Sequence, residues 1–307
     1  MVAGRRGRRC GTLALALIAA RCIAAVVAVG FASHPAAAAD ADVSQQGLWS
    51  SLLRDSRTIG LPTRFLEIIP DGFVQFEFAD LHAFAAEYHP SEHRLILNRS
   101  LSFNAAAGAL KPLKALASRD LSTLFHELVH VYMDYLATVP DVNAAGASAA
   151  GFMRFAREQQ ECRYRVVLIT PIRQRRTQTE VRVLTDRESW EALNEAWAVS
   201  AAWLLWTGRD LRVDYGKRAP KAWSTRLNKA DRGGELAGYY EPEDQQERGV
   251  TAKRHLAAES RVTPAEIAGI LRWIFEASPS FIETSTAAME SRRDPVPGSV
   301  PCSVHPP

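Results

Sequence analysis

The chain has 307 residues, of which 47% are hydrophobic and 23% charged, and its formal net charge is +3. Five arginines and no acidic residue fall within residues 1–39, so the rest of the chain is close to neutral. This balance excludes a strongly basic nucleic-acid-binding protein, and we expect no nucleic-acid partner. The length allows one large domain or two small ones.

Residues 1–39 have the organisation of a signal peptide. Four arginines precede an apolar stretch, and Ala37 and Ala39 form an A-x-A cleavage pattern before Asp40. We therefore expect an exported protein, periplasmic or secreted, that is cleaved near Ala39. An uncleaved anchor is the alternative and would be the sole membrane contact. Arg21 leaves only about ten unbroken apolar residues on either side, which is short for a membrane span.

Cleavage would leave two cysteines, Cys162 and Cys302, in an oxidising compartment. An even count there favours a disulfide, which would tie the C-terminal tail to the domain. Two unrelated thiols are the alternative. We expect a single domain over residues 40–285, followed by a loose Pro- and Ser-rich tail over 286–307.

The first predicted elements after the signal are a short helix and two strands. Residues 43–55 predict the helix, and 73–79 alternate in polarity as a half-buried strand does. Residues 93–98 predict a second strand after a turn. An Ala-rich segment from there to about Ala117 predicts further helix.

A longer helix then begins near Ser118 or Asp120, either of which is a suitable N-cap, and ends before Pro140. Residues 140–152 predict a loop. Residues 162–170 and 179–185 predict the two strands of a hairpin joined by a basic loop.

The strongest helix signal lies after this hairpin, from Asp186 to about Thr207. Thr185 and Glu188 form the T-x-x-E capping box, and Gly208 marks the expected end. Residues 209–260 give no clear assignment. A last helix is expected from Thr263 to about residue 277.

The helix expected from Ser118 contains the motif HELVH, with His126 and His130 four residues apart and Glu127 beside the first. Residues at this spacing share one helix face, so the two imidazoles can converge on a metal ion. Catalytic zinc usually takes three protein ligands and leaves a fourth position open. The sequence must therefore supply a third ligand.

No remaining histidine or cysteine completes a known pattern. The position six after His130 is Leu136, which excludes the pattern H-E-x-x-H-x-x-G-x-x-H. A site with an upstream cysteine as its third ligand is also excluded, because the nearest upstream cysteine is Cys22 in the signal. Glu188, Glu191 and Glu195 lie on one face of the helix expected from Asp186. Glu195 lies deepest among apolar residues, where an unpaired carboxylate would be costly, and we predict it as the ligand ahead of Glu191.

HELVHVYMDY resembles the active helix of thermolysin-like peptidases, HELxHxxxDY. Asn194-Glu195-Ala196-Trp197-Ala198 resembles their second motif, N-E-A-x-S/A, whose glutamate is the third zinc ligand. The resemblance implies the gluzincin group of zinc metallopeptidases. Val199 stands where that family has an aspartate that orients a zinc histidine. Asn194 is therefore the first candidate for that orienting role, and Asp134 the second.

The resemblance implies an α+β, zincin-like fold. We expect a small N-terminal β-sheet and the HELVH helix, followed by a mainly helical part with an inserted hairpin. It also implies that residues 93–98 form an edge strand that pairs with extended substrate.

The implied function is hydrolysis of peptide or protein substrates with one Zn²⁺, held by His126, His130 and Glu195, and with Glu127 as general base. An oxyanion donor is also expected, with Tyr240 and His255 placed ahead of Tyr239 and Tyr215. A catalytically silent exported binding module with this fold and an exported structural protein with a chance HExxH are the alternatives.

Overall fold

The computed structural model describes residues 36–82, 84–104, 109–172, 178–289 and 302. It is a mixed α+β structure built mainly of helices with small sheets. The helices are α1 (Ala36–Thr58), α2 (Ser118–Thr138), α3 (Ala147–Gln159), α4 (Asp186–Leu211), α5 (Lys221–Gly233), α6 (Gln245–Val250), α7 (Pro264–Trp273) and α8 (Pro279–Ala287). The strands are β1 (Gln75–Ala79), β2 (Ala86–His89), β3 (Arg94–Asn98), β4 (Ser102–Asn104), β5 (Ala109–Leu110), β6 (Val166–Ile169), β7 (Glu180–Val183), β8 (Tyr239–Tyr240) and β9 (Arg254–His255).

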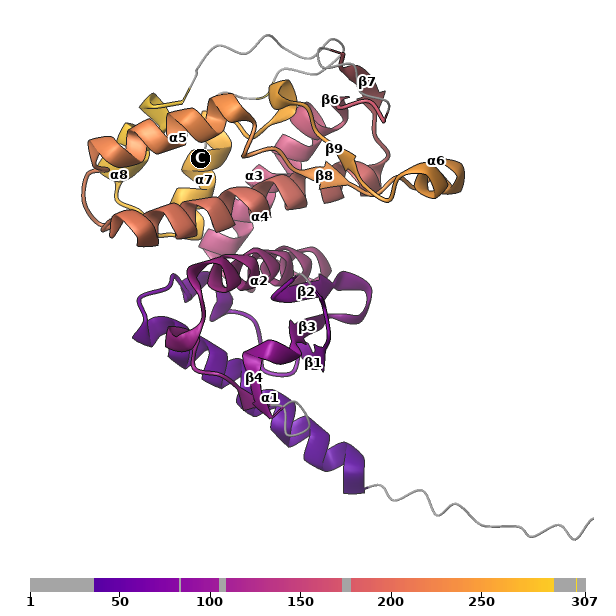
Figure 1. Cartoon of the computed structure of the whole chain (residues 1–307), viewed down its shortest axis with the longest axis vertical. Coiled ribbons are helices and arrows are strands. Elements are labelled where there is room, and N and C mark those ends of the chain that lie inside the picture. The colour runs from indigo at the N-terminus through magenta and orange to yellow at the C-terminus, as the bar shows by residue number, and fades with distance from the viewer. Residues whose placement is uncertain (1–35, 83, 105–108, 173–177, 290–301, 303–307) are drawn as a thin grey trace, which may run out of the picture.

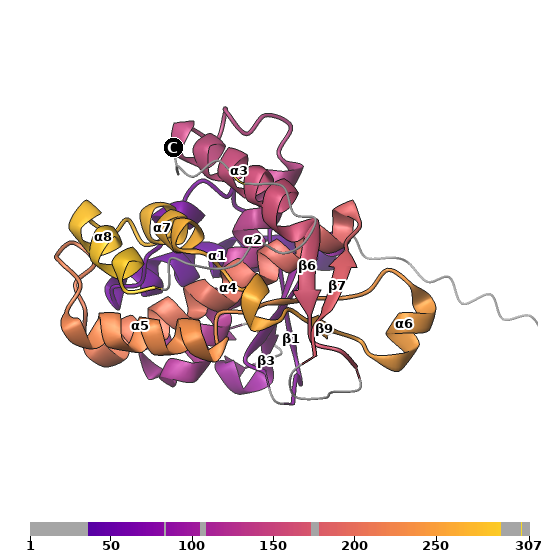
Figure 2. The ribbon, with the colours of Figure 1, turned by 90° about the horizontal axis from the view of Figure 1, so that it is seen from above.

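The helix α2 separates two parts of the molecule (Figure 1). On one side lie α1 and the three-stranded sheet, in the order β1-β3-β2, with β1 parallel and β2 antiparallel to β3. On the other side α4 packs along α2, and α3 contacts α2 as well through Phe152 and Tyr132. Figure 2 places α5 and α8 at one end of the molecule and α6 at the other.

The α2 helix forms as predicted because its apolar residues recur at helical spacing. Leu121, Leu124, Leu128 and Tyr132 are all buried, and the helix ends at Thr138, ahead of Pro140. Its N-cap position is taken by Ala117 without a side-chain cap, so the expected cap from Ser118 or Asp120 is wrong.

The capping box that opens α4 is confirmed, since Thr185 Oγ1 accepts from the Glu188 amide and the Glu188 carboxylate accepts from the Thr185 amide. The helix continues past Gly208 to Leu211, three residues beyond the expected mark, and closes with Arg212 in the left-handed region. Gly208 serves packing instead, because a Cβ there would lie 2.1 Å from the Tyr215 hydroxyl.

Three other expectations about local structure are wrong. The segment before Ala117 holds β4, β5 and short 3₁₀ turns in its described residues, because Pro112 interrupts any helix there. The predicted loop over 140–152 ends early, since α3 begins at Ala147 and buries Phe152 and its neighbours. Residues 160–164 form a π-helical turn, so the hairpin strand begins only at Val166.

The expected disulfide between Cys162 and Cys302 is present, with the two Cα atoms 5.2 Å apart. It fixes one point of the C-terminal tail beside the π-helical turn that follows α3. The expected signal lies largely outside the described residues, and the other tail positions beyond 289 lie outside them as well. Within the described ranges, no helix combines the length and apolar composition that crossing a bilayer requires.

Candidate metal centre

His126 and His130 lie one turn apart on the face of α2 that meets α4. Their Nε2 atoms are 3.0 Å apart, and their side chains are only 16% and 9% exposed. The helix points this face inward because the apolar residues on its other sides pack into the core. The predicted pair of imidazoles therefore converges on one point.

Glu195 reaches the same point from α4. Its Oε2 lies 3.4 Å from His126 Nε2, and its Oε1 lies 3.4 Å from His130 Nε2. Among the described residues, these three side chains form the one group of three or more potential His, Cys, Asp or Glu ligands whose donor atoms lie together. The structure thus gathers the three predicted ligands, although 65 positions separate His130 from Glu195 in the sequence.

The spacing of these donor atoms matches what zinc requires. Zinc–ligand bonds of 2.0–2.2 Å in a tetrahedron place ligand atoms about 3.3–3.6 Å apart. Each histidine Nε2 lies within this interval of a different oxygen of the Glu195 carboxylate, and the histidine–histidine separation is slightly shorter. Glu195 Oε2 is also buried without a hydrogen-bond partner of normal geometry. Two imidazoles and a carboxylate, with one such unsatisfied oxygen, fit a zinc ion.

The charges at this point favour a cation. Burial by itself would raise the pKa of Glu195, but His130 and His126 outweigh it and hold that pKa well below its usual range. Burial by itself would lower the pKa of His130, but the Glu195 carboxylate outweighs it and raises that pKa to about 9. An ionised carboxylate is therefore in place, and a metal would replace the proton that His130 otherwise holds.

Asn194 fixes the orientation of His130. Its side-chain oxygen lies 3.0 Å from His130 Nδ1, in a buried contact. An amide oxygen only accepts, so Nδ1 carries a proton and Nε2 is the nitrogen that faces the other ligands. Asp134, the second candidate for this role, instead accepts from the Tyr88 hydroxyl and lies 2.6 Å from His93 Nδ1.

Glu127 follows the first histidine but points to the sheet. Its Oε2 accepts a hydrogen bond of 3.0 Å from the backbone amide of Tyr88 in β2. Burial raises the pKa of Glu127 above its usual value, which His126, His130 and the Tyr88 amide partly oppose. The carboxylate is therefore held between α2 and the outer edge of β2.

This contact corrects the expected edge strand. Residues 93–98 contain β3, which lies in the centre of its sheet with β1 and β2 on either side. β2 is the strand at the edge, and its Tyr88 amide faces Glu127 rather than β3. The sequence could not settle this order, because the four residues of β2 were not predicted as a strand.

The other two glutamates of α4 hold a loop against the helix. Glu188 accepts from the backbone amide of Glu243, and Glu191 accepts from that of Glu241. Burial raises the pKa of Glu191 to about 7. These carboxylates therefore have hydrogen-bond partners of their own, whereas Glu195 faces the histidines.

The same loop brings Tyr239, rather than Tyr240, to the candidate metal centre. A Cβ on Gly238 would lie 2.5 Å from the backbone nitrogen of Ala196, so glycine permits the close approach of this strand to α4 beside Glu195. Burial raises the pKa of Tyr239, and the negative charge of Glu195 adds to the rise. Tyr240 lies on the opposite face of the strand, fully buried, with Arg182, Arg254 and Glu188 among its charged neighbours.

The remaining candidates lie elsewhere. His255 pairs across the strand from Tyr239, with ring centroids 5.7 Å apart, and is exposed. The Tyr215 hydroxyl donates to the Leu204 carbonyl within the core. Successive side chains of a strand point to opposite faces, which separates Tyr239 from Tyr240. The sequence did not indicate this difference, because it did not predict the strand β8.

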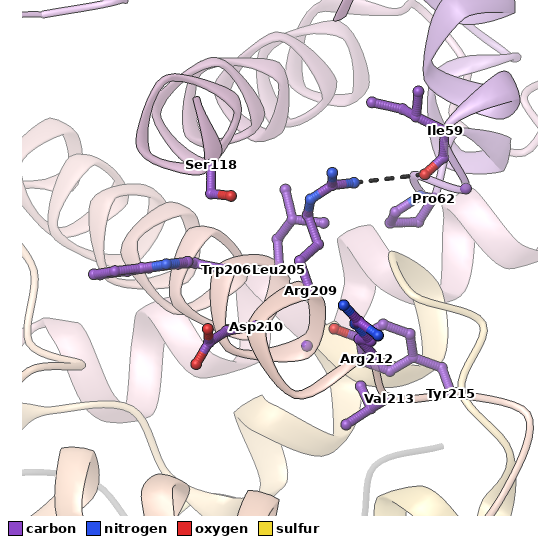
Figure 3. Close-up of a pocket in the computed structure, with 12 residues that line it drawn as sticks. Ile59, Pro62, Ser118, Leu205, Trp206, Arg209, Asp210, Arg212, Val213 and Tyr215 are labelled. Atoms are coloured by element: carbon purple, nitrogen blue, oxygen red, sulfur yellow. Dashed lines mark hydrogen bonds between the residues drawn. The ribbon is translucent and has the colours of Figure 1, made fainter. Parts of the chain in front are cut away.

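A cavity of about 490 Å³ lies at the C-terminal end of α4, and of the candidate residues only Tyr215 lines it. Figure 3 shows the Arg209 side chain in it, donating to the Ile59 carbonyl, with Arg212 nearby. This contact joins the end of α4 to the segment after α1, and we assign the cavity no part in the chemistry.

Comparison of the chain with protein-family models, with curated proteins and with solved structures finds no match. The candidate site therefore stands on its own geometry.

Proposed function

We propose that this protein is a zinc-dependent peptidase of the gluzincin type with a zincin-like fold. The observation that carries the proposal is the convergence of His126, His130 and Glu195 from two helices at zinc-compatible separations. Glu127 adjoins them on α2. A chance HExxH on an ordinary helix would give no reason for a buried carboxylate to meet both histidines.

Zinc at this position would polarise a substrate carbonyl and lower the pKa of a water molecule. Glu127 takes a proton from the attacking water as its oxygen bonds to the carbonyl carbon. Glu127 then passes this proton to the amide nitrogen as the C–N bond breaks. The products are a carboxylate and an amine, so the reaction consumes one water.

Tyr239 is the donor that this arrangement offers to the developing oxyanion. Its strand passes beside Glu195, because Gly238 lies against the Ala196 backbone, and burial together with the Glu195 charge raises the pKa of Tyr239. Preorganised donors of this kind stabilise the transition state more than the ground state. We therefore assign to Tyr239 the role that the sequence suggested for Tyr240, with His255 as its neighbour.

Extended substrate would pair with β2. Within the described residues no strand covers its outer edge. The Tyr88 amide points outward, and Ala86 shares that side because strand backbone groups alternate. A peptide added along this edge would cross Glu127 and lie beside the metal centre, which is the geometry that hydrolysis needs.

We further propose that the mature protein acts on peptides or proteins after export to the periplasm or the medium. The N-terminal arginines, the apolar stretch and the A-x-A pattern support export. The Cys162–Cys302 disulfide is consistent with an oxidising compartment.

The test is incubation of the zinc-loaded chain from Asp40 with a mixed peptide library, followed by mass spectrometry of the products. Glu127→Gln is the matched control, because an amide oxygen can still accept from the Tyr88 amide while the base is lost. We expect cleavage by the wild type alone. A zinc-loaded wild type that cleaves nothing would contradict peptidase activity, and equal cleavage by both would exclude Glu127 as the base.

A further inference from the structure

Lys253 contacts Tyr239, the candidate oxyanion donor. Its Nζ lies 2.7 Å from the Tyr239 hydroxyl oxygen and 3.9 Å from the centroid of the Tyr239 ring. Tyr239 pairs with His255, and Lys253 precedes His255 by two residues, so both basic side chains lie on one face with the tyrosine. The contact therefore follows from the register of β8 and β9.

This register is held by charges and by packing at both ends. Arg254, only 4% exposed, pairs with Glu247 of α6 and with Glu180 of β7. Gly238 packs against the Ala196 backbone at the other end. The strand pair that carries Tyr239 and Lys253 is thus joined both to the hairpin and to α4.

The chemistry of the two groups fixes the direction of the hydrogen bond. An ammonium group has three donors and no acceptor, so the tyrosine oxygen must accept from Lys253. The tyrosine's own proton is then left for a second partner. Gly238, the residue before Tyr239, lies against the Ala196 backbone, so the metal centre at Glu195 is the polar site next to this tyrosine. The Tyr239 O–H is therefore aimed at the site, and the neighbouring cation polarises it as a donor.

We propose that Lys253 is a positioning residue that holds the Tyr239 hydroxyl with its proton toward the reacting carbonyl. Lys253 is exposed, and within the described residues no carboxylate forms an ion pair with it. Its charge is therefore available to the tyrosine oxygen. This inference rests on the proposed peptidase function, and it adds a residue that neither the HELVH motif nor the glutamate helix indicates.

The test is a double-mutant cycle of Lys253→Met and Tyr239→Phe, with Lys253→Arg as the conservative variant. Loss of one oxyanion donor costs about 10²–10³ in kcat, and we expect Lys253→Met to cost about 10-fold, with KM little changed and zinc content retained. Lys253→Arg should recover most of the loss. In the Tyr239→Phe background, Lys253→Met should have no further effect.

A second readout does not depend on turnover. A dipeptide phosphonate, a stable anionic mimic of the tetrahedral intermediate, should bind the zinc-loaded wild type more tightly than either single variant, and the double variant should be no weaker than Tyr239→Phe. Equal losses in both backgrounds, or unchanged phosphonate affinity in Lys253→Met, would overturn the inference. A rise in KM alone would instead make Lys253 a substrate contact.

The two proposals can fail separately. A wild type that binds the phosphonate with coupled effects of Lys253 and Tyr239, yet cleaves no peptide, would contradict the function and retain the positioning role. A zinc-loaded wild type that neither cleaves peptides nor binds the phosphonate would overturn both.

Discussion

The two walls of the candidate metal centre are built in different ways. The α2 wall supplies His126, Glu127 and His130 within five consecutive residues of one helix. The opposite wall gathers Asn194 and Glu195 from α4, Tyr239 from β8 and Lys253 from the segment before β9. One wall depends on helical periodicity alone, and the other on contacts between distant segments.

This difference shows that residue type and spacing do not settle the role of a side chain on the second wall. Glu188, Glu191 and Glu195 lie on one face of α4, yet two accept backbone amides of the 241–243 loop and the third meets the histidines. Their roles are set by what packs against the helix. Substitutions in the first wall should therefore abolish function, while those in the second should range from loss of the metal at Glu195 to smaller effects at the other residues.

The largest effect should come from Glu127→Gln in the first wall. Because the base is lost and the ligands are kept, peptide hydrolysis should fall by about 10²–10⁴-fold while zinc is retained. Initial rates and zinc content of the same preparations would measure this. Glu283→Gln, an exposed change on α8, is the control and should leave both unchanged. Comparable activity in Glu127→Gln would place the base elsewhere.

The next effect separates the glutamates of α4. Glu195→Ala should lower zinc affinity by more than the roughly 10–100-fold that an outer partner controls, because it removes a ligand. Glu191→Ala should keep the metal within a few-fold. Glu188→Ala should also keep it but cost about 1 kcal/mol of stability through the lost cap. Zinc titration and thermal unfolding of the three variants would measure these effects. Loss of the metal in Glu191→Ala rather than in Glu195→Ala would reverse the ligand assignment.

Asn194→Ala tests how the second wall supports the first. The His130 ring would lose its buried Nδ1 partner, so we expect zinc affinity to fall by about 10–100-fold. Asn194→Asp offers an acceptor at the same place and should retain tighter binding than alanine. Equal affinity in wild type and Asn194→Ala would mean that α2 alone orients His130.

The smallest effect should come from Gly238→Ala, which displaces the loop and leaves the ligands in place. The added Cβ would meet the Ala196 backbone, and such overpacking costs about 1–3 kcal/mol. Hydrolysis should decrease with zinc retained, because Tyr239 moves. Gly249→Ala in α6 is the control, since no atom lies within 4 Å of a Cβ there. Unchanged activity in Gly238→Ala would show that the loop position is unimportant.

The sequence was most informative where local rules decide the outcome. Helical periodicity gave α2 and its inward histidine face, and the capping box gave the start of α4. The cost of burying an unpaired carboxylate indicated Glu195 as the third ligand. The even number of cysteines left after cleavage indicated the disulfide.

The parts that sequence missed depend on long-range pairing. The place of β3 in the centre of its sheet follows from two pairings that its own pattern does not encode. β8 is two residues long and lies in a polar stretch, so its alternation could not distinguish Tyr239 from Tyr240. The Lys253 contact depends in turn on how β8 pairs with β9.

The most direct test of the account is a zinc titration of the purified chain from Asp40, with a chromophoric chelator as competitor and circular dichroism to confirm folding. We expect one tightly bound zinc per chain, and we expect it to be lost when any one of His126, His130 or Glu195 is replaced. A folded wild type that binds no zinc at neutral pH would contradict the central claim. Equally tight zinc binding by a variant in which all three residues are replaced would also contradict it.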